Sequence, residues 1–146
     1  MAEPRSITVS IGKDHYHTDI TAGEHTLVAD EPEGLGGTDD GPDPYALLLA
    51  SLGACKAITV RMYADRKQWP LERLELTLTH DRVHANDCDD CGHQEGMISV
   101  IECAITAFGE LSDEQRSRLV EIADKCPVHK TITGPNHIRT KLADAR

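Results

Sequence analysis

The segment from Tyr45 to Val60, YALLLASLGACKAITV, most constrains the fold, because nearly every position in it is apolar or small. Asp43 and Pro44 before it are typical of a helix start, with Asp as the N-cap and Pro at the first helical position. A membrane span needs about 20 apolar residues, and Lys56 interrupts this run, so the segment predicts a buried core helix. If the helix continues to Lys67, it is roughly 36 Å long at about 1.5 Å per residue. That length is large for one small domain and predicts an oligomer.

Alternation of apolar and polar residues predicts strands on both sides of this helix. Three short strands precede it and form a meander, and two longer strands and a short final one follow it. The expected strands are Ile7–Ile11, His15–Ile20, His25–Ala29, Leu74–His80, Met97–Phe108 and Ile138–Leu142.

A second helix is predicted after Ser112, because Ser112 to Gln115 form a capping-box pattern. Its apolar face carries Leu119, Ile122, Ala123 and Cys126, and Pro127 marks its expected end. The element order is therefore βββαββαβ, and we expect one α+β domain over residues 1–146.

The segment from Asp30 to Asp43 is acidic and rich in Gly and Pro, with no core signal. A loop of this length in a compact domain is usually functional or mobile, and it is a candidate gate of the site.

The net charge and the N-terminal sequence argue against nucleic-acid binding and against secretion. The 146 residues carry a net charge of −10, which would repel a nucleic-acid backbone. The N-terminus has no apolar run typical of a signal peptide, so we expect a cytoplasmic protein without membrane association. The five cysteines are odd in number, and a cytoplasm keeps thiols reduced. Both facts disfavour structural disulfides and make catalytic or metal-binding thiols the candidates.

Cys55 and Cys126 lie on the apolar faces of the two predicted helices. A buried cysteine is most often a small hydrophobe, but Gly53 and Ala54 beside Cys55 permit the close approach that a redox pair needs. In such a pair we assign attack to Cys55, because Cys126 stands at the C-terminal end of its helix, where the dipole disfavours a thiolate. His129 and Lys130 are interpreted as a solvated face.

The other cysteines lie on or near the predicted strands. His80, His84, Cys88, Cys91 and His93 have spacings that could bind zinc, and C-x2-C could also close a second redox pair. An exposed polar loop is the favoured interpretation, and no metal is assigned. Cys103 is interpreted as core packing.

Three stretches carry a family resemblance: GPDPYALLLASLGAC around Cys55, MYADRKQWPLE after it, and EIADKCPVHKTI around Cys126. They resemble the OsmC/Ohr family of organic hydroperoxide reductases. The resemblance implies an intertwined homodimer and a thiol-dependent peroxidase in oxidative-stress defence, without a cofactor. It implies that a hydroperoxide oxidises Cys55 to a sulfenic acid, and that Cys126 then closes a disulfide. A dithiol such as a lipoylated protein would reduce that disulfide.

Two positions depart from the family pattern. Well-characterised peroxidases of the family use a Glu near the start of the long helix, where this chain has Pro44 to Leu47, and an Arg from the N-terminal strands. The stretch from Gly12 to His25 holds no Arg, and its basic residues are Lys13, His15, His17 and His25. These departures support an alternative, a non-peroxidase dimer of the same fold that senses oxidants or binds a ligand. A third hypothesis is metal binding through the Cys88 loop.

Overall fold

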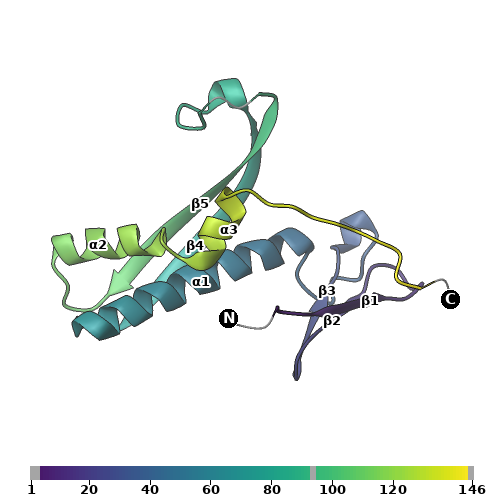
Figure 1. The fold of residues 1–146 in the computed structure, drawn as a ribbon, viewed down its shortest axis with the longest axis horizontal. Coiled ribbons are helices and arrows are strands. Elements are labelled where there is room, and N and C mark those ends of the chain that lie inside the picture. The colour runs from purple at the N-terminus through teal and green to yellow at the C-terminus, as the bar shows by residue number, and fades with distance from the viewer. Residues whose placement is uncertain (1–3, 93–94, 145–146) are drawn as a thin grey trace. The chain divides into compact units, whose positions relative to one another are not determined.

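The computed structural model describes residues 4–92 and 95–144 (Figure 1). Internal packing divides the chain into two compact units, residues 1–50 and 51–146. Helix α1 (Pro44–Lys67) begins in the first unit and continues into the second. The expectation of one domain over residues 1–146 stays a prediction.

The first unit is built on the expected meander. Strands β1 (Thr8–Ile11), β2 (Thr18–Ala22) and β3 (His25–Ala29) pair antiparallel in the order β1-β2-β3. The second strand begins at Thr18 rather than at His15, because the backbone of His15 is left-handed, with φ of 55°, and turns the chain. The expected buried face of the first strand is wrong for this chain, since all four residues of β1 are exposed.

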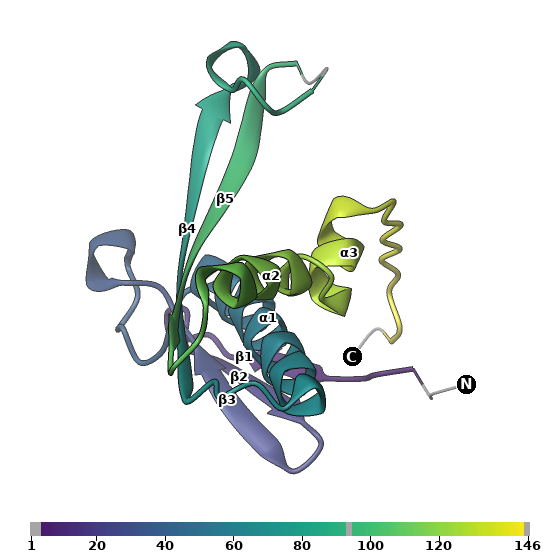
Figure 2. The ribbon, with the colours of Figure 1, turned by 90° about the vertical axis from the view of Figure 1, so that its left-hand side faces the viewer.

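The second unit contains a long hairpin. Strands β4 (Arg73–His84) and β5 (Met97–Phe108) pair antiparallel along their whole length, from Arg73 opposite Phe108 to His84 opposite Met97. The predicted bounds of β5 are confirmed, whereas β4 runs to His84 instead of ending at His80. Figure 2 shows the closed end of this hairpin extending away from helices α2 (Asp113–Ala123) and α3 (Pro127–Thr133).

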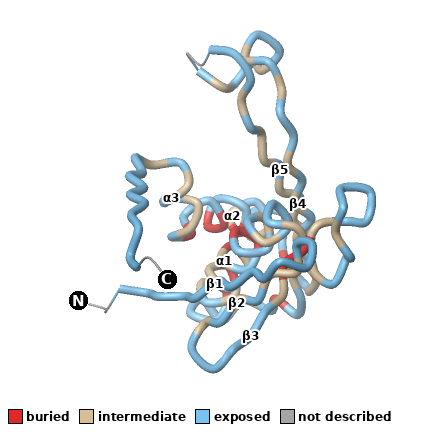
Figure 3. The backbone as a smooth tube through the Cα atoms, turned by 90° about the vertical axis from the view of Figure 1, so that its right-hand side faces the viewer, coloured by how far each residue is buried: buried red, intermediate tan, exposed pale blue. Residues whose placement is uncertain are grey.

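The core of the second unit lies between α1, α2 and the adjoining loops (Figure 3). α2 begins with the expected capping box between Ser112 and Gln115, which satisfies two free backbone N–H groups. The predicted apolar face of α2 is confirmed as buried. The buried cluster consists of Val60, Ala64, Leu71, Leu111, Leu119, Ile122 and Ala123.

Helix α1 starts as expected, with Asp43 Oδ1 accepting from Ala46 N at 2.7 Å. The expectation that it is a buried core helix is wrong for the single chain. Its buried residues are Leu52, Gly53, Lys56, Val60 and Ala64. Ile58 and Met62 on other sides are 60% and 66% exposed. By length and composition α1 would also qualify as a membrane span, as the core helices of many soluble proteins do.

The C-terminal part differs most from the prediction. Pro127 does not mark a helix end: it opens α3 with Cys126 as the N-cap, as Pro at the first helical position commonly does. The final strand at Ile138–Leu142 is wrong, because the described residues 135–144 form neither helix nor strand. Ile138 and Leu142 are 88% and 82% exposed, and no described strand pairs with this segment.

Candidate functional site

The structure brings Cys55 and Cys126 together. Cys55 projects from α1, where its Sγ accepts a hydrogen bond from Val128 N at 3.5 Å. Cys126 Sγ accepts from His129 N at 3.3 Å and thereby caps α3. Both thiols are free and are hydrogen-bonded to each other. Cys55 on α1 and Cys126 at the start of α3 therefore lie close together. Gly53 does not face Cys126, because its open side is turned to Leu78 of β4.

The two thiols have different environments. Cys126 is fully buried, whereas Cys55 is half-buried. Burial is the largest effect and raises the pKa of the Cys126 thiol. The hydrogen bond from His129 N lowers this pKa, the hydrogen bond with Cys55 raises it, and the positive charge of Lys56 lowers it. The helix-dipole argument for Cys126 is wrong, because this residue precedes α3 and does not end α2.

Lys56 lies beside this pair and is 3% exposed. Its ammonium group donates to Ala123 O at 3.2 Å, to Asp124 Oδ1 at 3.0 Å and to His129 Nδ1 at 2.9 Å. All three N–H donors are satisfied, which is what a buried ammonium requires. Lys56 thus joins the helix of Cys55 to the end of α2 and to α3.

His129 does not belong to a solvated face, which corrects the prediction. Because Nδ1 of His129 accepts from Lys56, the proton of the neutral ring is on Nε2. Lys130 is exposed, as expected. The sequence signal for this contact was a lysine in an apolar helix, but its partners lie 67 to 73 residues away along the chain.

A cavity of about 650 Å³ opens beside Lys56. Cys103 lines it, so this residue is not the core packing that we expected. Burial raises the pKa of the Cys103 thiol, and the charge of Lys56 opposes this rise. The lining residues are Leu52, Lys56, Ser99, Ile101, Cys103, Ile105, Val120, Asp124, His129, Ile132 and Thr133.

Among the described residues, the predicted zinc ligands Cys88 and Cys91 lie together, with a carboxylate oxygen of Asp90 within 4.8 Å of their sulfurs. Cys88 and Cys91 form a disulfide with a Cα–Cα distance of 5.5 Å. His80 Nε2 lies 3.0 Å from Ser99 Oγ, and His84 Nδ1 accepts from Asn86 N at 3.1 Å. His93 lies outside the described residues. In the disulfide form, the two thiolates that zinc would need are bonded to each other. Metal binding by the reduced cysteines with Asp90 stays a prediction.

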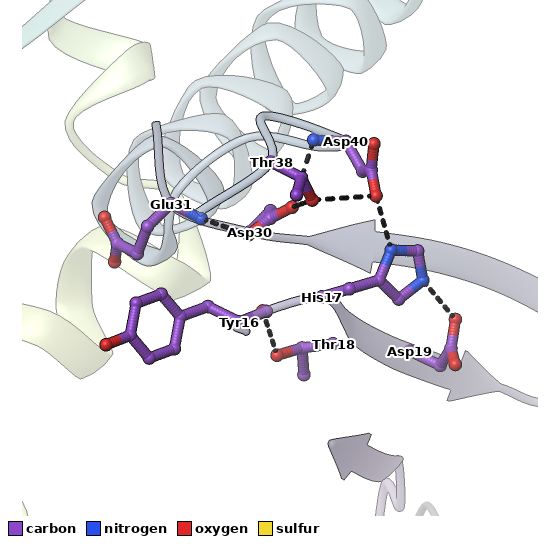
Figure 4. A network of polar contacts seen from close by, with 8 residues as sticks. All are labelled: Tyr16, His17, Thr18, Asp19, Asp30, Glu31, Thr38 and Asp40. Carbon is purple, nitrogen blue, oxygen red and sulfur yellow. Dashed lines mark hydrogen bonds and ion pairs between the residues drawn. The ribbon is translucent and has the colours of Figure 1, made fainter. Parts of the chain in front are cut away.

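The loop from Asp30 to Asp43 is ordered around a buried carboxylate, which the sequence analysis missed. Asp30 is 2% exposed and accepts from Glu31 N at 2.7 Å, from Thr38 Oγ1 at 2.7 Å and from Asp40 N at 3.1 Å (Figure 4). The hydroxyl of Thr38, followed by these N–H groups, lowers the pKa of Asp30 to about 2 against the cost of burial. Asx-type bonding of this kind leaves no hydrophobic pattern in a sequence.

The basic residues of the N-terminal strands belong to the same unit as this loop. The imidazole of His17 bridges Asp40 at 2.9 Å and Asp19 at 3.2 Å, and these two hydrogen bonds raise its pKa (Figure 4). His15 Nδ1 donates to Gly36 O at 3.1 Å. Lys13 and His25 are exposed. His17 and His15 therefore attach the loop to the turn before β2.

Comparison with known proteins identifies the class. The OsmC-like protein family matches residues 37–141, and the chain belongs to that family. The fold agrees with an OsmC-like protein from Mycoplasma pneumoniae, with 21% identity, a TM-score of 0.70 and coverage of 92% of this chain and 90% of the other. An organic hydroperoxide resistance protein OsmC from Legionella pneumophila is 21% identical, with a TM-score of 0.65 and 92% of each chain covered.

A third solved structure is an organic hydroperoxide resistance protein from Vibrio cholerae with captopril bound in one of its active sites. It is 22% identical, with a TM-score of 0.62 and coverage of 92% and 87%. No curated protein matches the chain. The predicted family and the α+β class are confirmed.

Proposed function

We propose that this protein is a thiol-dependent peroxidase that reduces organic hydroperoxides in oxidative-stress defence. The observation that carries the proposal is the contact between the Cys55 and Cys126 thiols in a chain of this family. The Cys55 thiolate attacks the terminal oxygen of the hydroperoxide, so that an S–O bond forms and the O–O bond breaks. The sulfenic acid stays on Cys55, and the alkoxide takes up one proton from water and leaves as the alcohol. Cys126 then attacks the sulfenic sulfur, a disulfide forms and water leaves. A dithiol such as a lipoylated protein restores the two thiols.

Burial supports the assignment of these roles. Cys55 is half-buried and is the more accessible of the two thiols to a hydroperoxide. Cys126 is fully buried and burial raises its pKa, which disfavours its thiolate at neutral pH. Its place next to Cys55 suits a resolving thiol, whose target is an intramolecular sulfur.

Lys56 supplies the cation that the family pattern takes from an Arg. Its ammonium lies within the network that holds His129 and acts to lower the pKa of Cys126. A buried positive charge stabilises thiolates and the negative charge that develops on the leaving oxygen. The stretch from Pro44 to Leu47, where the family pattern has its Glu, holds no acidic residue.

The assembly and the compartment belong to the same proposal. We expect an intertwined homodimer in the cytoplasm. Large apolar side chains exposed on β1, α1 and the C-terminal segment support a partner chain, among them Val9, Ile11, Met62 and Ile138. Isolated soluble monomers rarely expose so much apolar surface.

The first test is the mass and the disulfide map after one equivalent of cumene hydroperoxide, run beside hydrogen peroxide. We expect a rapid Cys55–Cys126 disulfide, formed preferentially with the organic peroxide. Cys55→Ser should abolish consumption. Cys126→Ser keeps an N-cap oxygen for α3 and should accumulate a sulfenic acid at Cys55 that dimedone traps. Cys103→Ser is the matched control and should leave turnover unchanged. Turnover retained in Cys55→Ser would overturn the proposal.

The cavity favours a second candidate, a ligand-binding protein of the same fold. Its walls are mostly apolar, with Lys56, Asp124 and His129 at one side, as small-molecule sites usually are. Thiols that stay reduced in the peroxide experiment would favour this candidate over the peroxidase.

A further inference from the structure

The closed end of the β4–β5 hairpin is a built turn that the proposed peroxidase does not use. Beyond the last strand pair, Ala85 N donates to Gly96 O at 2.8 Å, and residues Ala85–Asp87 form a short 3₁₀ helix. Cys88 N donates to Ala85 O at 3.2 Å and closes this helix. Gly92 and Gly96 both have left-handed backbones, with φ of 70° and 71°, which side chains disfavour. The described residues 85–92 therefore hold a defined conformation around Cys88 and Cys91.

The two cysteines of this turn are joined to each other, while Cys55, Cys103 and Cys126 are free. Cys103 pairs with Leu78 on β4, six positions along β5 from Met97, where the hairpin closes. At about 3.3 Å per residue that separation is roughly 20 Å. The Cys88–Cys91 disulfide is therefore out of reach of Cys103 within the same chain.

We propose that Cys88 and Cys91 form a second thiol–disulfide couple, separate from Cys55 and Cys126, which exchanges electrons with external thiols that carry positive charge. A thiolate of the partner attacks one sulfur, the S–S bond breaks and a mixed disulfide forms, while the displaced cysteine takes up a proton. A second partner thiol resolves the mixed disulfide. The balance is one protein disulfide and two partner thiols giving one protein dithiol and one partner disulfide.

The charge of the turn carries the preference for a cationic partner. Asp87, Asp89 and Asp90 flank the two cysteines in the sequence, Glu95 follows, and no Lys or Arg occurs between Val83 and Gly96. Asp90 Oδ1 lies 3.4 Å from Cys88 Sγ. The attacking thiolate is itself negative, so these carboxylates oppose every attack. A positive group on the partner offsets the repulsion, whereas a second negative group adds to it. Because the turn is exposed, salt should weaken the effect.

Both cysteines are half-buried and lie at the end of the hairpin that extends away from α2 and α3 (Figure 2). A small thiol, or a basic protein that presents one, can therefore reach the disulfide without entering the cavity beside Lys56. This inference goes beyond the proposed peroxidase, because it needs neither Cys55 nor Cys126.

The test uses the full chain with Cys55, Cys103 and Cys126 all replaced by Ser, so that Cys88 and Cys91 are the remaining thiols. Reduction by cysteamine, 2-mercaptoethanol and 2-mercaptoethanesulfonate is followed by alkylation and mass, with each rate expressed per thiolate. We expect cysteamine to react at least about threefold faster than the sulfonate. After the reductant is removed, oxidation by air or by diamide should restore the disulfide between Cys88 and Cys91. The wild-type chain, mapped by peptide, provides the same readout if the triple variant does not fold.

Two variants isolate the charge. Asp89→Asn with Asp90→Asn should bring the two rates together, as should 1 M NaCl, whereas the exposed pair Asp14→Asn with Glu24→Gln should leave the ratio unchanged. A ratio of one in the unsubstituted turn would overturn the preference for cationic thiols. The proposal of a Cys88–Cys91 thiol–disulfide couple would be overturned if both thiols stayed free in the presence of oxidant, or if they bound one equivalent of zinc. Neither result depends on hydroperoxide turnover, so failure of the peroxidase proposal is distinguishable.

Discussion

Lys56 shows how one residue changes meaning between sequence and structure. In the sequence it interrupts an apolar run and counts against a membrane span. In the structure it is the buried ammonium that joins α1 to Ala123, Asp124 and His129. The closeness of Cys55 and Cys126 could be anticipated from their places on two apolar helix faces, whereas their redox roles stay predictions. The Lys56 network could not be anticipated, because its geometry depends on packing between segments distant in the chain.

Replacing Lys56 tests whether this network stabilises the fold. Lys56→Met removes the donor to three groups and leaves Ala123 O without its ammonium partner, so we expect a loss of about 1–3 kcal/mol in the free energy of unfolding. Lys125→Met, at an exposed neighbouring lysine, should change it by less than about 0.5 kcal/mol. Urea denaturation of both variants measures the difference. Equal stabilities of the two variants would contradict a structural role for the network.

Asp30 gives the first unit a definite response to acid. Its folded pKa of about 2 lies below the ordinary value of 3.8, so the ionised carboxylate stabilises the folded state above pH 3.8. This contribution is lost as the pH falls from 3.8 to about 2. Asp30→Asn should therefore be less stable than the wild type at pH 6, with the gap closing near pH 2. Urea unfolding at each pH measures the gap, and parallel stability curves would count against it.

At the scale of elements, strong periodicity and unambiguous caps gave the accurate predictions. The strands His25–Ala29 and Met97–Phe108 and the Ser112 capping box have the predicted bounds. The errors fall where one residue type has two uses. Pro127 could end a helix or begin one, and the Cys126 cap decides for the second.

Gly53 fixes the approach of α1 to β4. A Cβ at this position would lie 2.8 Å from Leu78 Cδ1, the end of a flexible side chain. Gly53→Ala should therefore be nearly neutral, because Leu78 can move and alanine favours the helix by about 1 kcal/mol. Gly53→Val adds two methyl groups more than Gly53→Ala does and should cost about 1–3 kcal/mol. Thermal unfolding of the pair distinguishes them, and equal midpoints would mean that the contact is loose.

At the scale of the whole molecule, the single chain does not explain why so many large apolar side chains are exposed. The sequence predicted a buried face for the first strand, a buried long helix and a C-terminal strand. In the part of the chain that the structure describes, β1 is exposed, α1 is buried on one side only, and Ile138 and Leu142 are exposed. All three errors share one physical reason: periodicity predicts that a face is buried, but it does not say what covers that face.

Substitution on the exposed side of α1 tests the proposed homodimer. Ile58→Glu with Met62→Glu should dissociate it, because each carboxylate would have to be buried against a partner. Arg66→Glu, on the exposed last turn of the same helix, is the control. Sedimentation velocity gives the oligomeric state, and a wild-type Tm that rises with protein concentration is the second readout. A wild-type monomer at all concentrations would refute the dimer.

The sulfur of Cys126 has two roles: it caps helix α3, and it is one of the two sulfurs of the Cys55–Cys126 pair. Any free energy that the cap contributes to α3 in the reduced chain, and that changes when the sulfur bonds to Cys55, enters the redox equilibrium by the same amount. The stability of helix α3 and the reduction of the Cys55–Cys126 disulfide are therefore thermodynamically coupled, and each changes the other by the same free energy. Substitutions that strengthen or weaken α3 should therefore shift the midpoint potential without touching either thiol, and amide exchange at His129 should report the oxidation state of the chain.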